Sequence, residues 1–413
     1  MINTRVIGRS FGVFLMIVCT VFTAAFATAQ ENTPEPAGLS NDLEASAVIT
    51  ETLPFSPDFV NRLQLPDGFE VNIFAQGLGN IRMIAVAPDG TILITRRAEG
   101  DVIALTDADG DGTADSPDVN VVTSDLPFVH GIVFNGNRLY LATDTQVLVA
   151  DWANGTLSQP QVIINDLPVG GQHPNRTLGF SPDGMLYITV GSTCNACDET
   201  DPENATILRA QPNGTGREIF AQGLRNTIGF GWHPVTGELW GMDHGSDWRG
   251  NDQPPEELNR LEFERNYGWP FCFSNQQPDV YLAVPPPGSM GRAAYCQRTV
   301  PPVLEYTAHS APIGMVFYTA DQFPTDYSNN AFVAMRGSWN RNPPFGYKVV
   351  RIMFDDNGQP TGFEDFLTGF LVEEEIANIG RIAGVAIAPD GSLLITEDQN
   401  GVVYRVSYMG IEE

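Results

Sequence analysis

The sequence predicts an all-β protein, a six-bladed β-propeller built from four-stranded blades. Two observations predict this fold: an apolar strand–turn–strand segment recurs six times, and each copy is followed by a third short apolar segment. A unit spans about 45–50 residues where it is uninterrupted, which is the period of propeller blades. Helical periodicity is minor throughout, so we expect a single propeller domain over residues 63–413.

The six copies share alternating apolar residues on both sides of a turn that is rich in Pro, Asp, Asn and Gly. They are residues 81–97, 129–144, 176–191, 226–245, 311–337 and 380–398. A fourth strand follows most copies, but the chain ends soon after the third strand of the last one. The stretch FEVNIFAQGL at residues 69–78 resembles REIFAQGL at residues 217–224, a fourth strand. We therefore expect the N-terminal strand to complete the last blade and to close the ring.

The N-terminus has the features of an export signal. Arg5 and Arg9 precede an apolar run that ends in an Ala-Thr-Ala cleavage site, so residues 1–29 are predicted to be a signal peptide. A retained membrane anchor is the alternative, but small residues interrupt the apolar run early. Residues 30–62 are rich in Pro, Ser, Thr and acidic residues and are expected to be a flexible lead-in. The mature chain is expected in the periplasm or outside the cell, without stable membrane insertion.

The charge balance excludes one class of partner. The chain has a formal net charge of −28, and loss of Arg5 and Arg9 with the signal peptide leaves 20 basic residues against 50 acidic ones. Binding to a phosphate backbone needs a basic face, so nucleic acid is not an expected partner. Lys348 is the single lysine, so arginine supplies nearly all of the positive charge. A cluster of these scarce arginines is therefore informative.

Four cysteines remain in the mature chain, namely Cys194, Cys197, Cys272 and Cys296. In an exported protein they predict two disulfides, and pairing within each sequence-local couple is the simplest arrangement. A redox-active C-x-x-C is an alternative, but it belongs in a thioredoxin-like βαβ unit, which this chain lacks. A zinc site is the other alternative, but no histidine follows at finger-like spacing.

The start of the first strand in each repeat carries a guanidinium or imidazole group. In a propeller this strand lines the central channel, so these groups are expected at one mouth of the channel. They are Arg82, His130, His173 with Arg176, Arg225, His309 and Arg381. Each one alone could be an inter-blade hydrogen-bond partner or a solvated strand end. Together, in an acidic chain, they predict a site for a small polyanion, because clustered cations repel one another unless an anion neutralises them. Arginine binds carboxylates in a bidentate manner, so a ligand with several carboxylates is expected.

The sequence DHGSD at residues 243–247 predicts a calcium site close to this mouth. It follows the second strand of the fourth repeat, and it combines the backbone carbonyls of Gly245 and Ser246 with acidic neighbours. A simple glycine turn is the alternative.

The sequence DADGDGTADSPD at residues 107–118 predicts a second calcium site, an EF-hand-like loop between strands. Its acidic residues fall at ligand positions 1, 3, 5 and 12 of such a loop. They are Asp107, Asp109, Asp111 and Asp118. An acidic hairpin loop without a metal ion is the alternative.

Several motifs resemble those of the soluble quinoprotein sugar dehydrogenases, in the sorbosone (aldose) dehydrogenase branch. They are GGQHPNRTLGFSPDG, GSTCNACDETDP, GLRNTIGFGWHP, DHGSDWRGNDQPPEELN with NYGWPFC, HSAPIGMVFY, RGSWNR and GRIAGVAIAPDG, which together cover most of the mature chain. The resemblance implies a six-bladed propeller that holds pyrroloquinoline quinone (PQQ), a tricarboxylate, over the channel mouth together with Ca²⁺. The arginine-rich mouth calls for a ligand of this kind.

The resemblance also implies roles for individual residues. His173 resembles the catalytic base, which takes the proton of the sugar hydroxyl as hydride passes to the quinone. Arg225 and Asn226 resemble the pair that contacts the quinone, and Arg225 is assigned to catalysis as well. The carbonyls of Gly245 and Ser246 resemble the calcium ligands. Further cofactor contacts are expected from Arg176, His244, His309, Arg336 and Arg381.

The sequence therefore predicts an exported dehydrogenase that uses PQQ and Ca²⁺ to oxidise an aldose, a sorbosone-type sugar, or a related aldehyde or polyol. No C-x-x-C-H haem motif is present, so the electrons are expected to pass to a separate acceptor. A metal-dependent propeller lactonase is one alternative, but it needs a carboxylate cage where this chain has Arg and His. A non-catalytic extracellular binding propeller is the other, because fold does not determine function.

Overall fold

The computed structural model describes most of the chain after the predicted signal peptide. The described residues are 47–116, 119–282, 285–288, 291–372 and 376–410. The predicted signal peptide and the first part of the predicted lead-in therefore lie outside the described residues.

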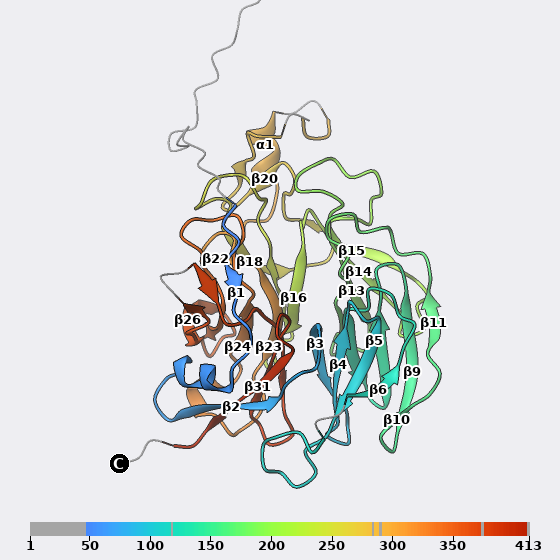
Figure 1. The fold of residues 1–413 in the computed structure, drawn as a ribbon. Coiled ribbons are helices and arrows are strands. Elements are labelled where there is room, and N and C mark those ends of the chain that lie inside the picture. Colours follow the sequence, from blue (N-terminus) through green and yellow to red (C-terminus); the bar gives the residue numbers. More distant parts are fainter. Residues whose placement is uncertain (1–46, 117–118, 283–284, 289–290, 373–375, 411–413) are drawn as a thin grey trace, which may run out of the picture. The chain divides into compact units, whose positions relative to one another are not determined.

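Antiparallel sheets make up nearly all of the regular secondary structure in the described chain (Figure 1). Within the described residues, six sheets contain four or five strands each. The first three are β3 (Ile81–Val86), β4 (Ile92–Arg96), β5 (Asp101–Leu105) and β6 (Asn120–Thr123); β7 (Gly131–Asn135), β8 (Arg138–Ala142) and β9 (Val147–Ala153) with β10 (Thr156–Leu157) and β11 (Gln161–Ile164); and β12 (Leu178–Phe180), β13 (Leu186–Val190), β14 (Thr206–Ala210), β15 (Glu218–Gln222) and β19 (Arg265–Asn266).

The next three sheets follow the same order of strands. They are β16 (Thr227–Trp232), β17 (Leu239–Asp243), β18 (Glu256–Leu261) and β22 (Leu304–Tyr306); β23 (Pro312–Phe317), β24 (Ala331–Met335), β25 (Lys348–Phe354) and β26 (Pro360–Leu367); and β29 (Ile382–Ile387), β30 (Leu393–Glu397) and β31 (Val402–Tyr408) with β2 (Phe69–Ala75). Strand β2 pairs antiparallel with β31, from Phe69 opposite Tyr408 to Ala75 opposite Val403. This pairing joins the two ends of the described chain.

The first strands of neighbouring sheets lie against one another. Strand β3 contacts β7, β7 contacts β12, β16 contacts β23, β23 contacts β29, and β29 contacts β3. Glycine makes the close approach possible: a Cβ on Gly229, Gly314 or Gly384 would lie 2.6–2.7 Å from a backbone oxygen of the next first strand. The repeated glycine of the first strand is thus explained by backbone packing around a common axis.

The segment before β2 differs from the prediction of a flexible lead-in. Strand β1 (Glu51–Thr52) pairs with β28 (Ala377–Asn378), which also pairs with β27 (Leu371–Val372). The 3₁₀ helix η1 (Pro57–Arg62) follows, and the apolar side chains of this segment pack on the largest buried cluster. They are Leu53, Phe55, Phe59 and Val60. Burial of these four side chains outweighs the turn-forming composition of the surrounding sequence.

Long connections extend two of the sheets. Between β18 and β22 the chain forms β20 (Cys272–Phe273), β21 (Gln277–Pro278) and α1 (Arg292–Cys296), and Figure 1 places β20 and α1 together at one end of the molecule. A second 3₁₀ helix, η2 (Thr325–Tyr327), precedes β24. Disulfides join Cys272 to Cys296 and Cys194 to Cys197, which is the sequence-local pairing. None of the helices in the described part of the chain is long and apolar enough to cross a membrane.

Candidate active site

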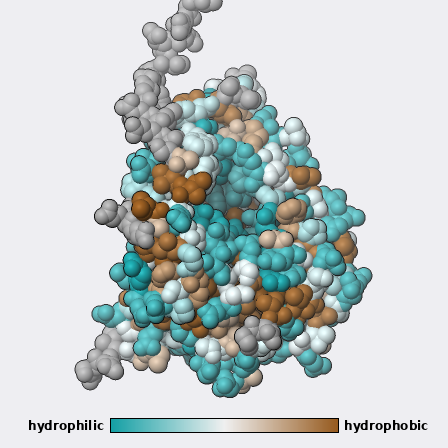
Figure 2. Space-filling model, viewed as in Figure 1, coloured by the Kyte–Doolittle hydropathy of each residue, from teal (hydrophilic) through white to brown (hydrophobic). Residues whose placement is uncertain are grey.

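The predicted site residues gather where the first strand of a sheet begins and the second strand ends. These two positions meet because the strands pair antiparallel, as when Thr227 of β16 lies opposite Asp243 of β17. In β3, β16, β23 and β29 the pairing register shifts directly after the first residue of the strand. Such bulges re-aim side chains and are frequent beside active sites. Figure 2 shows a hollow with hydrophilic walls near the middle of the same view as Figure 1.

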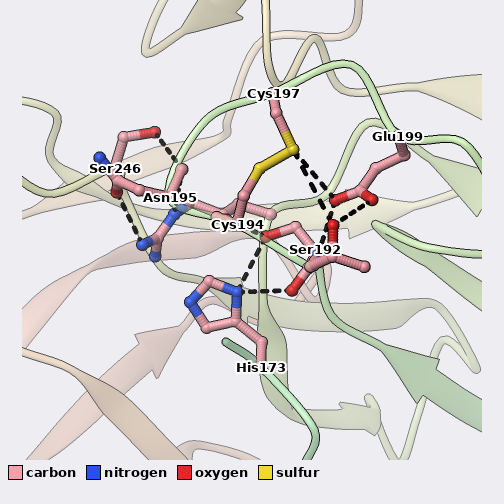
Figure 3. Close-up of a disulfide and its surroundings, with 9 residues drawn as sticks. His173, Ser192, Cys194, Asn195, Cys197, Glu199 and Ser246 are labelled. Atoms are coloured by element: carbon pink, nitrogen blue, oxygen red, sulfur yellow. Dashed lines mark hydrogen bonds between the residues drawn. A yellow bond between two sulfur atoms is a disulfide. The ribbon is translucent and has the colours of Figure 1, made fainter. Parts of the chain in front are cut away.

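His173, on the loop before β12, is fixed in one tautomer. Its Nδ1 lies 2.8 Å from both the carbonyl oxygen and the Oγ of Ser192 (Figure 3). The Ser192 hydroxyl donates to the carbonyl of Cys194 at 2.8 Å, so both Ser192 oxygens accept from Nδ1–H. Nε2 therefore carries the lone pair. Burial, and after it the charge of Arg225, lowers the pKa of His173 to about 3, so the ring is neutral at pH 7.

Arg176 lies beneath this loop instead of in the surface of the site. Its side chain is fully buried and donates to the backbone carbonyls of Asp144, His173 and Pro168 at 3.0, 3.0 and 2.7 Å. Arg176 therefore holds the backbone of His173 in place. This placement does not favour the predicted contact between Arg176 and a cofactor.

Arg225 and Asn226 precede β16 and are held by a buried carboxylate. Asp243 accepts both of their backbone N–H groups at 2.9 Å. The Arg225 guanidinium contacts Asp247 at 3.0 Å through Nη2, and its Nε donates to the carbonyl of Asn195 at 2.9 Å. Asn195 is a member of the site that sequence reasoning did not find.

His244 orients Asn226. The Nε2–H of His244 donates to the carbonyl of Pro312, so its Nδ1 accepts from the Asn226 amide at 3.4 Å. Burial lowers the pKa of His244 to about 4, which keeps the ring neutral. On the other side, a Cβ on Gly191 would lie 2.6 Å from the Cβ of His173 and 2.7 Å from the Oδ1 of Asn226. His173 and Asn226 thus converge on Gly191.

A second group of residues forms an arginine-rich wall around Asp398. Arg82 and Arg336 both contact this carboxylate, Arg336 through Nε at 2.8 Å and Nη2 at 3.0 Å. Burial opposes ionisation of Asp398, but the charges of Arg82 and Arg336 outweigh it and lower its pKa to about 2. Arg381 donates to the carbonyls of Arg336 and Gly337, and burial followed by the charge of Arg336 lowers its pKa to about 10.

This wall carries more positive than negative charge. Three guanidinium groups surround one ionised carboxylate, and burial raises the pKa of the adjacent Glu397 to about 7. Among the described residues, the buried Nε of Arg82 has no hydrogen-bond partner. The wall therefore has the charge and the unused donor capacity to bind an anion.

His130 and Arg97 complete this side of the site. His130 is fully buried, and its Nδ1 faces the carbonyl of Arg176 at 3.3 Å. Burial, and after it the charge of Arg82, keeps the pKa of His130 well below its usual range. Arg97 directly follows β4, as Arg336 follows β24, and its guanidinium lies 5.0 Å from the centre of the Phe128 ring. Sequence reasoning missed Arg97, although Arg336 in the same position of another sheet was predicted.

His309 lies at the periphery of the site. Its Nε2 donates to the carbonyl of Gly250 at 2.8 Å, and its Nδ1 is 3.9 Å from Asp247 Oδ1. Its side chain is buried, and burial lowers its pKa. His309 thus supports the segment that carries Asp247, the ion-pair partner of Arg225.

A cavity of about 20 Å³ is lined by Gly245 and Ser246, the predicted calcium ligands. Asp243, an acidic residue of the predicted motif, also lines it, together with Glu257 and Asp279, which sequence reasoning did not single out. Burial, and after it the charge of Asp243, raises the pKa of Glu257 to about 8. The volume suits a single ion or water, and oxygen-rich linings of this kind suit Ca²⁺.

The acidic loop at residues 107–118 brings together a different set from the predicted one. Carboxylate oxygens of Asp107, Asp109 and Asp115 lie within 4.8 Å of one another. The Asp111 carboxylate instead accepts from the backbone N–H and the hydroxyl of Thr113. Asp118 lies outside the described residues.

Two exposed tryptophans stand beside the site. The rings of Trp248 and Trp339 pack edge to face with centroids 5.2 Å apart, although 43% and 38% of these residues' surfaces remain exposed. Trp248 follows Asp247, and Trp339 lies three residues after Arg336. The backbone N–H of Trp248 donates to Asn340 Oδ1 at 2.6 Å, which links the two loops. An aromatic surface thus borders both groups of site residues.

Comparison with known proteins places this geometry in a family. Residues 63–409 match the model of the TrAA12-like family. A pyrroloquinoline quinone-dependent pyranose dehydrogenase of Coprinopsis cinerea is 26% identical over 86% of this chain, a match that spans 56% of that protein. The holo form of the PQQ domain of pyranose dehydrogenase from Coprinopsis cinerea superposes with a TM-score of 0.70 at 23% identity, over 84% of this chain and 97% of that structure. A calcium structure of a Trichoderma reesei family AA12 carbohydrate-active enzyme gives a TM-score of 0.71 at 21% identity, over 87% and 99%.

Proposed function

Because this chain belongs to the TrAA12-like family and is similar to a PQQ-dependent pyranose dehydrogenase, we propose that it oxidises a sugar with PQQ as cofactor. The substrate class is an aldose, a sorbosone-type sugar, or a related aldehyde or polyol. One observation carries the proposal: a neutral His173, with Nε2 available as a base, stands beside Arg225 and Asn226 in a site that also has an arginine-rich wall. A base and an anion site are the two parts that this chemistry requires.

The residues present fit PQQ. A tricarboxylate supplies the negative charge that the wall around Asp398 lacks, and the Nε of Arg82 offers a donor without a partner. Arg82, Arg336 and Arg381 would hold its carboxylates, and Arg225 with Asn226 would contact its quinone. When bound, PQQ supplies an acceptor for the two electrons and the hydrogen that leave the substrate as hydride.

His173 takes the hydroxyl proton of the substrate at Nε2. A pKa of about 3 in the free protein makes a weak base, because desolvation and Arg225 disfavour the imidazolium. Carboxylates bound on the arginine wall reduce the net positive charge of the site and so raise the pKa of His173. The base is thus strengthened when the cofactor is in place, while Ser192 keeps the tautomer fixed.

Ca²⁺ belongs in the cavity beside Gly245 and Ser246. Asp243, Glu257 and Asp279 supply acidic linings, and the cation would offset the burial and the charge of Asp243, which together raise the pKa of Glu257. Its charge would also act on the adjacent Arg225 region and favour electron density on the quinone. The Asp107, Asp109 and Asp115 cluster is a second, separate candidate for Ca²⁺.

The sugar approaches over Trp248 and Trp339. Exposed aromatic faces next to polar groups suit the apolar faces of a pyranose ring, and these two rings border both groups of site residues. The remaining parts of the proposal are a six-bladed propeller closed by β2 over residues 63–413, a signal peptide at residues 1–29, an exported mature chain, and a separate electron acceptor.

Titration of the metal-loaded, cofactor-free chain with PQQ tests the binding half of this proposal. We expect one PQQ per chain, with affinity that falls at least tenfold in Arg381→Ala. The matched control is Arg405→Ala, which removes an arginine that pairs with Asp390 away from the site. Equal affinity of wild type and Arg381→Ala, or the absence of binding, contradicts the proposal.

A further inference from the structure

Asn195 connects Arg225 to the segment after β17. Its carbonyl accepts from Arg225 Nε at 2.9 Å and from the Ser246 hydroxyl at 3.3 Å. Its side-chain Oδ1 accepts from Arg225 Nη2 at 3.0 Å and from the backbone N–H of Asp247 at 2.7 Å, and its Nδ2 donates to the Asp247 carbonyl at 2.9 Å. All hydrogen-bonding groups of the side chain are therefore engaged in this link.

The loop that presents Asn195 is closed by a disulfide and braced at its base. Asn195 lies between Cys194 and Cys197, which are joined (Figure 3). Glu199 accepts the backbone N–H and the hydroxyl of Thr193, both at 2.7 Å. The same loop begins at Ser192, whose backbone N–H donates to the carbonyl of Arg225 at 2.8 Å.

The loop thus contacts both residues assigned to catalysis. Ser192 fixes the Nδ1 of His173, and Asn195 fixes the guanidinium of Arg225. The Ser192 hydroxyl in turn donates to the carbonyl of Cys194, a member of the disulfide. One covalently closed turn therefore sets the distance and the orientation between the base and the guanidinium group.

We propose that Asn195 is a positioning residue for Arg225, and that the Cys194–Cys197 disulfide holds it in place. This inference rests on the proposed function. A buried guanidinium needs well-placed acceptors, because its desolvation is repaid only by good hydrogen-bond geometry. An open four-residue turn samples many conformations, and closing it removes most of those that turn Asn195 away. An added dithiol that reduces the Cys194–Cys197 disulfide, and is itself oxidised to a disulfide, thus lowers activity by releasing Arg225.

A double-mutant cycle tests the coupling between the disulfide and Asn195. Wild type, Asn195→Ala, Cys194→Ser/Cys197→Ser and the triple variant are compared for PQQ affinity, kcat, KM and Tm. We expect Asn195→Ala to lower kcat/KM and PQQ affinity at least tenfold when the disulfide is present, but less than threefold when it is absent. The control is Asn213→Ala, because Asn213 holds only its own turn through Thr215. We expect it to match wild type.

A second measurement does not need the cofactor. Hydrogen exchange at the Asp247 amide, which donates to Asn195 Oδ1, should be faster in Asn195→Ala and in the cysteine variant than in wild type. Reduced wild-type protein replaces the cysteine variant if that variant does not fold. Wild-type kinetics in Asn195→Ala, or multiplicative losses across the cycle, overturn the inference. Failure of wild type to bind PQQ overturns the proposed function instead, and the exchange rates then decide the positioning role alone.

Discussion

Replacing Asp398 with asparagine should lower the stability of the free protein and strengthen its affinity for PQQ. Asp398 is 2% exposed and accepts from Arg82 and from two nitrogens of Arg336. Removing one member of a buried ion pair costs about 3–5 kcal/mol, and lowering the pKa of Asp398 from 3.8 to about 2 corresponds to about 2 kcal/mol. A domain of about 350 residues loses about 1 °C of Tm per 0.7 kcal/mol, so Tm should fall by about 3–7 °C.

The pH dependence of this loss has a definite sign. Because the folded-state pKa of Asp398 lies below its unfolded value, its contribution is present above about pH 4 and disappears as the pH falls towards 2. The difference in Tm between wild type and Asp398→Asn should therefore shrink as the pH falls from 4 towards 2. Calorimetry of the cofactor-free protein across this range measures it. Between pH 7 and pH 5 the difference also contains the titration of the adjacent Glu397, whose pKa of about 7 is raised by burial and, less strongly, by the charge of Asp398.

The affinity for PQQ should increase in Asp398→Asn, although the stability of the free protein falls. Without the Asp398 carboxylate, no ion-pair partner in the wall competes with PQQ for the three guanidinium groups. PQQ should therefore bind several-fold more tightly at low ionic strength, and this gain in affinity should shrink with added salt. Asp390→Asn is the control, because it removes the same charge from a half-exposed pair with Arg405. Weaker PQQ binding by Asp398→Asn at low salt would refute the charge argument. It would show instead that Asp398 holds the arginine side chains in the conformation that binds PQQ.

Four further predictions follow from the site. Since burial and the charge of Arg225 lower the pKa of His173 to about 3 in the cofactor-free protein, its ring should stay neutral from pH 7 to pH 5, whereas an ordinary imidazole would lose most of its base form. NMR of the cofactor-free protein would contradict the assignment if the His173 ring titrated near pH 6.5. Gly191→Ala places a methyl group 2.6 Å from the Cβ of His173 and should lower kcat at least tenfold. The control is Gly291→Ala, whose methyl group meets no atom within 4 Å and which should match wild type. Equal kinetics for the two variants would contradict the packing argument. Trp248→Ala or Trp339→Ala should raise KM for the sugar about tenfold and leave the PQQ affinity, measured by direct titration, unchanged. An unaltered KM would show that neither tryptophan contacts the sugar. Chelation of Ca²⁺ should lower the Tm of the protein and its PQQ affinity, and readdition should restore both; insensitivity to the chelator would exclude a calcium site.

The sequence repeat predicted the sheets because the period of the apolar segments is local information. Each strand–turn–strand segment reappears as the first two strands of a sheet, and the likeness between residues 69–78 and 217–224 predicted that β2 joins the last sheet. The regular structure of the segment 51–62, which contains β1 and η1, was not predictable from the repeat. Its four apolar side chains find partners only in strands that are distant in sequence, so local composition indicated a flexible segment.

The candidate site was predicted in part for a similar reason. The starts of the first strands identified His173, Arg225 and Arg381. Arg336 and residues 244–246, which follow second strands, were also predicted, but Arg97 and Asp398 in the same position of other sheets were missed. In β3, β16, β23 and β29 a bulge after the first residue of the strand re-aims the side chains near the mouth, and the repeat pattern does not show that bulge. Arg176 is a different case: its position in the repeat indicated a ligand contact, whereas its guanidinium donates to buried backbone carbonyls.

Glu257, Asp279 and Asn195 were not predictable from the repeat, because Asp279 and Asn195 lie in connections without internal periodicity and Glu257 meets Asp279 only through one of these connections. Glu257 and Asp279 are brought together only by the disulfide-bonded connection between β18 and β22. Asn195 lies between two cysteines that were noted only for their sulfur chemistry. Its role depends on hydrogen bonds to Arg225 and Asp247, which a sequence pattern does not show.

The most direct test of the central claim is dye reduction by the calcium-loaded chain, with and without PQQ, across a panel of aldoses, sorbosone and polyols. Wild type and His173→Ala are measured side by side, with PQQ binding to each determined separately. The account predicts turnover that requires PQQ, together with a His173→Ala protein that binds PQQ within a few-fold of wild type and loses at least 100-fold in kcat. PQQ-dependent turnover that survives in His173→Ala, or turnover of the panel without PQQ, would contradict it.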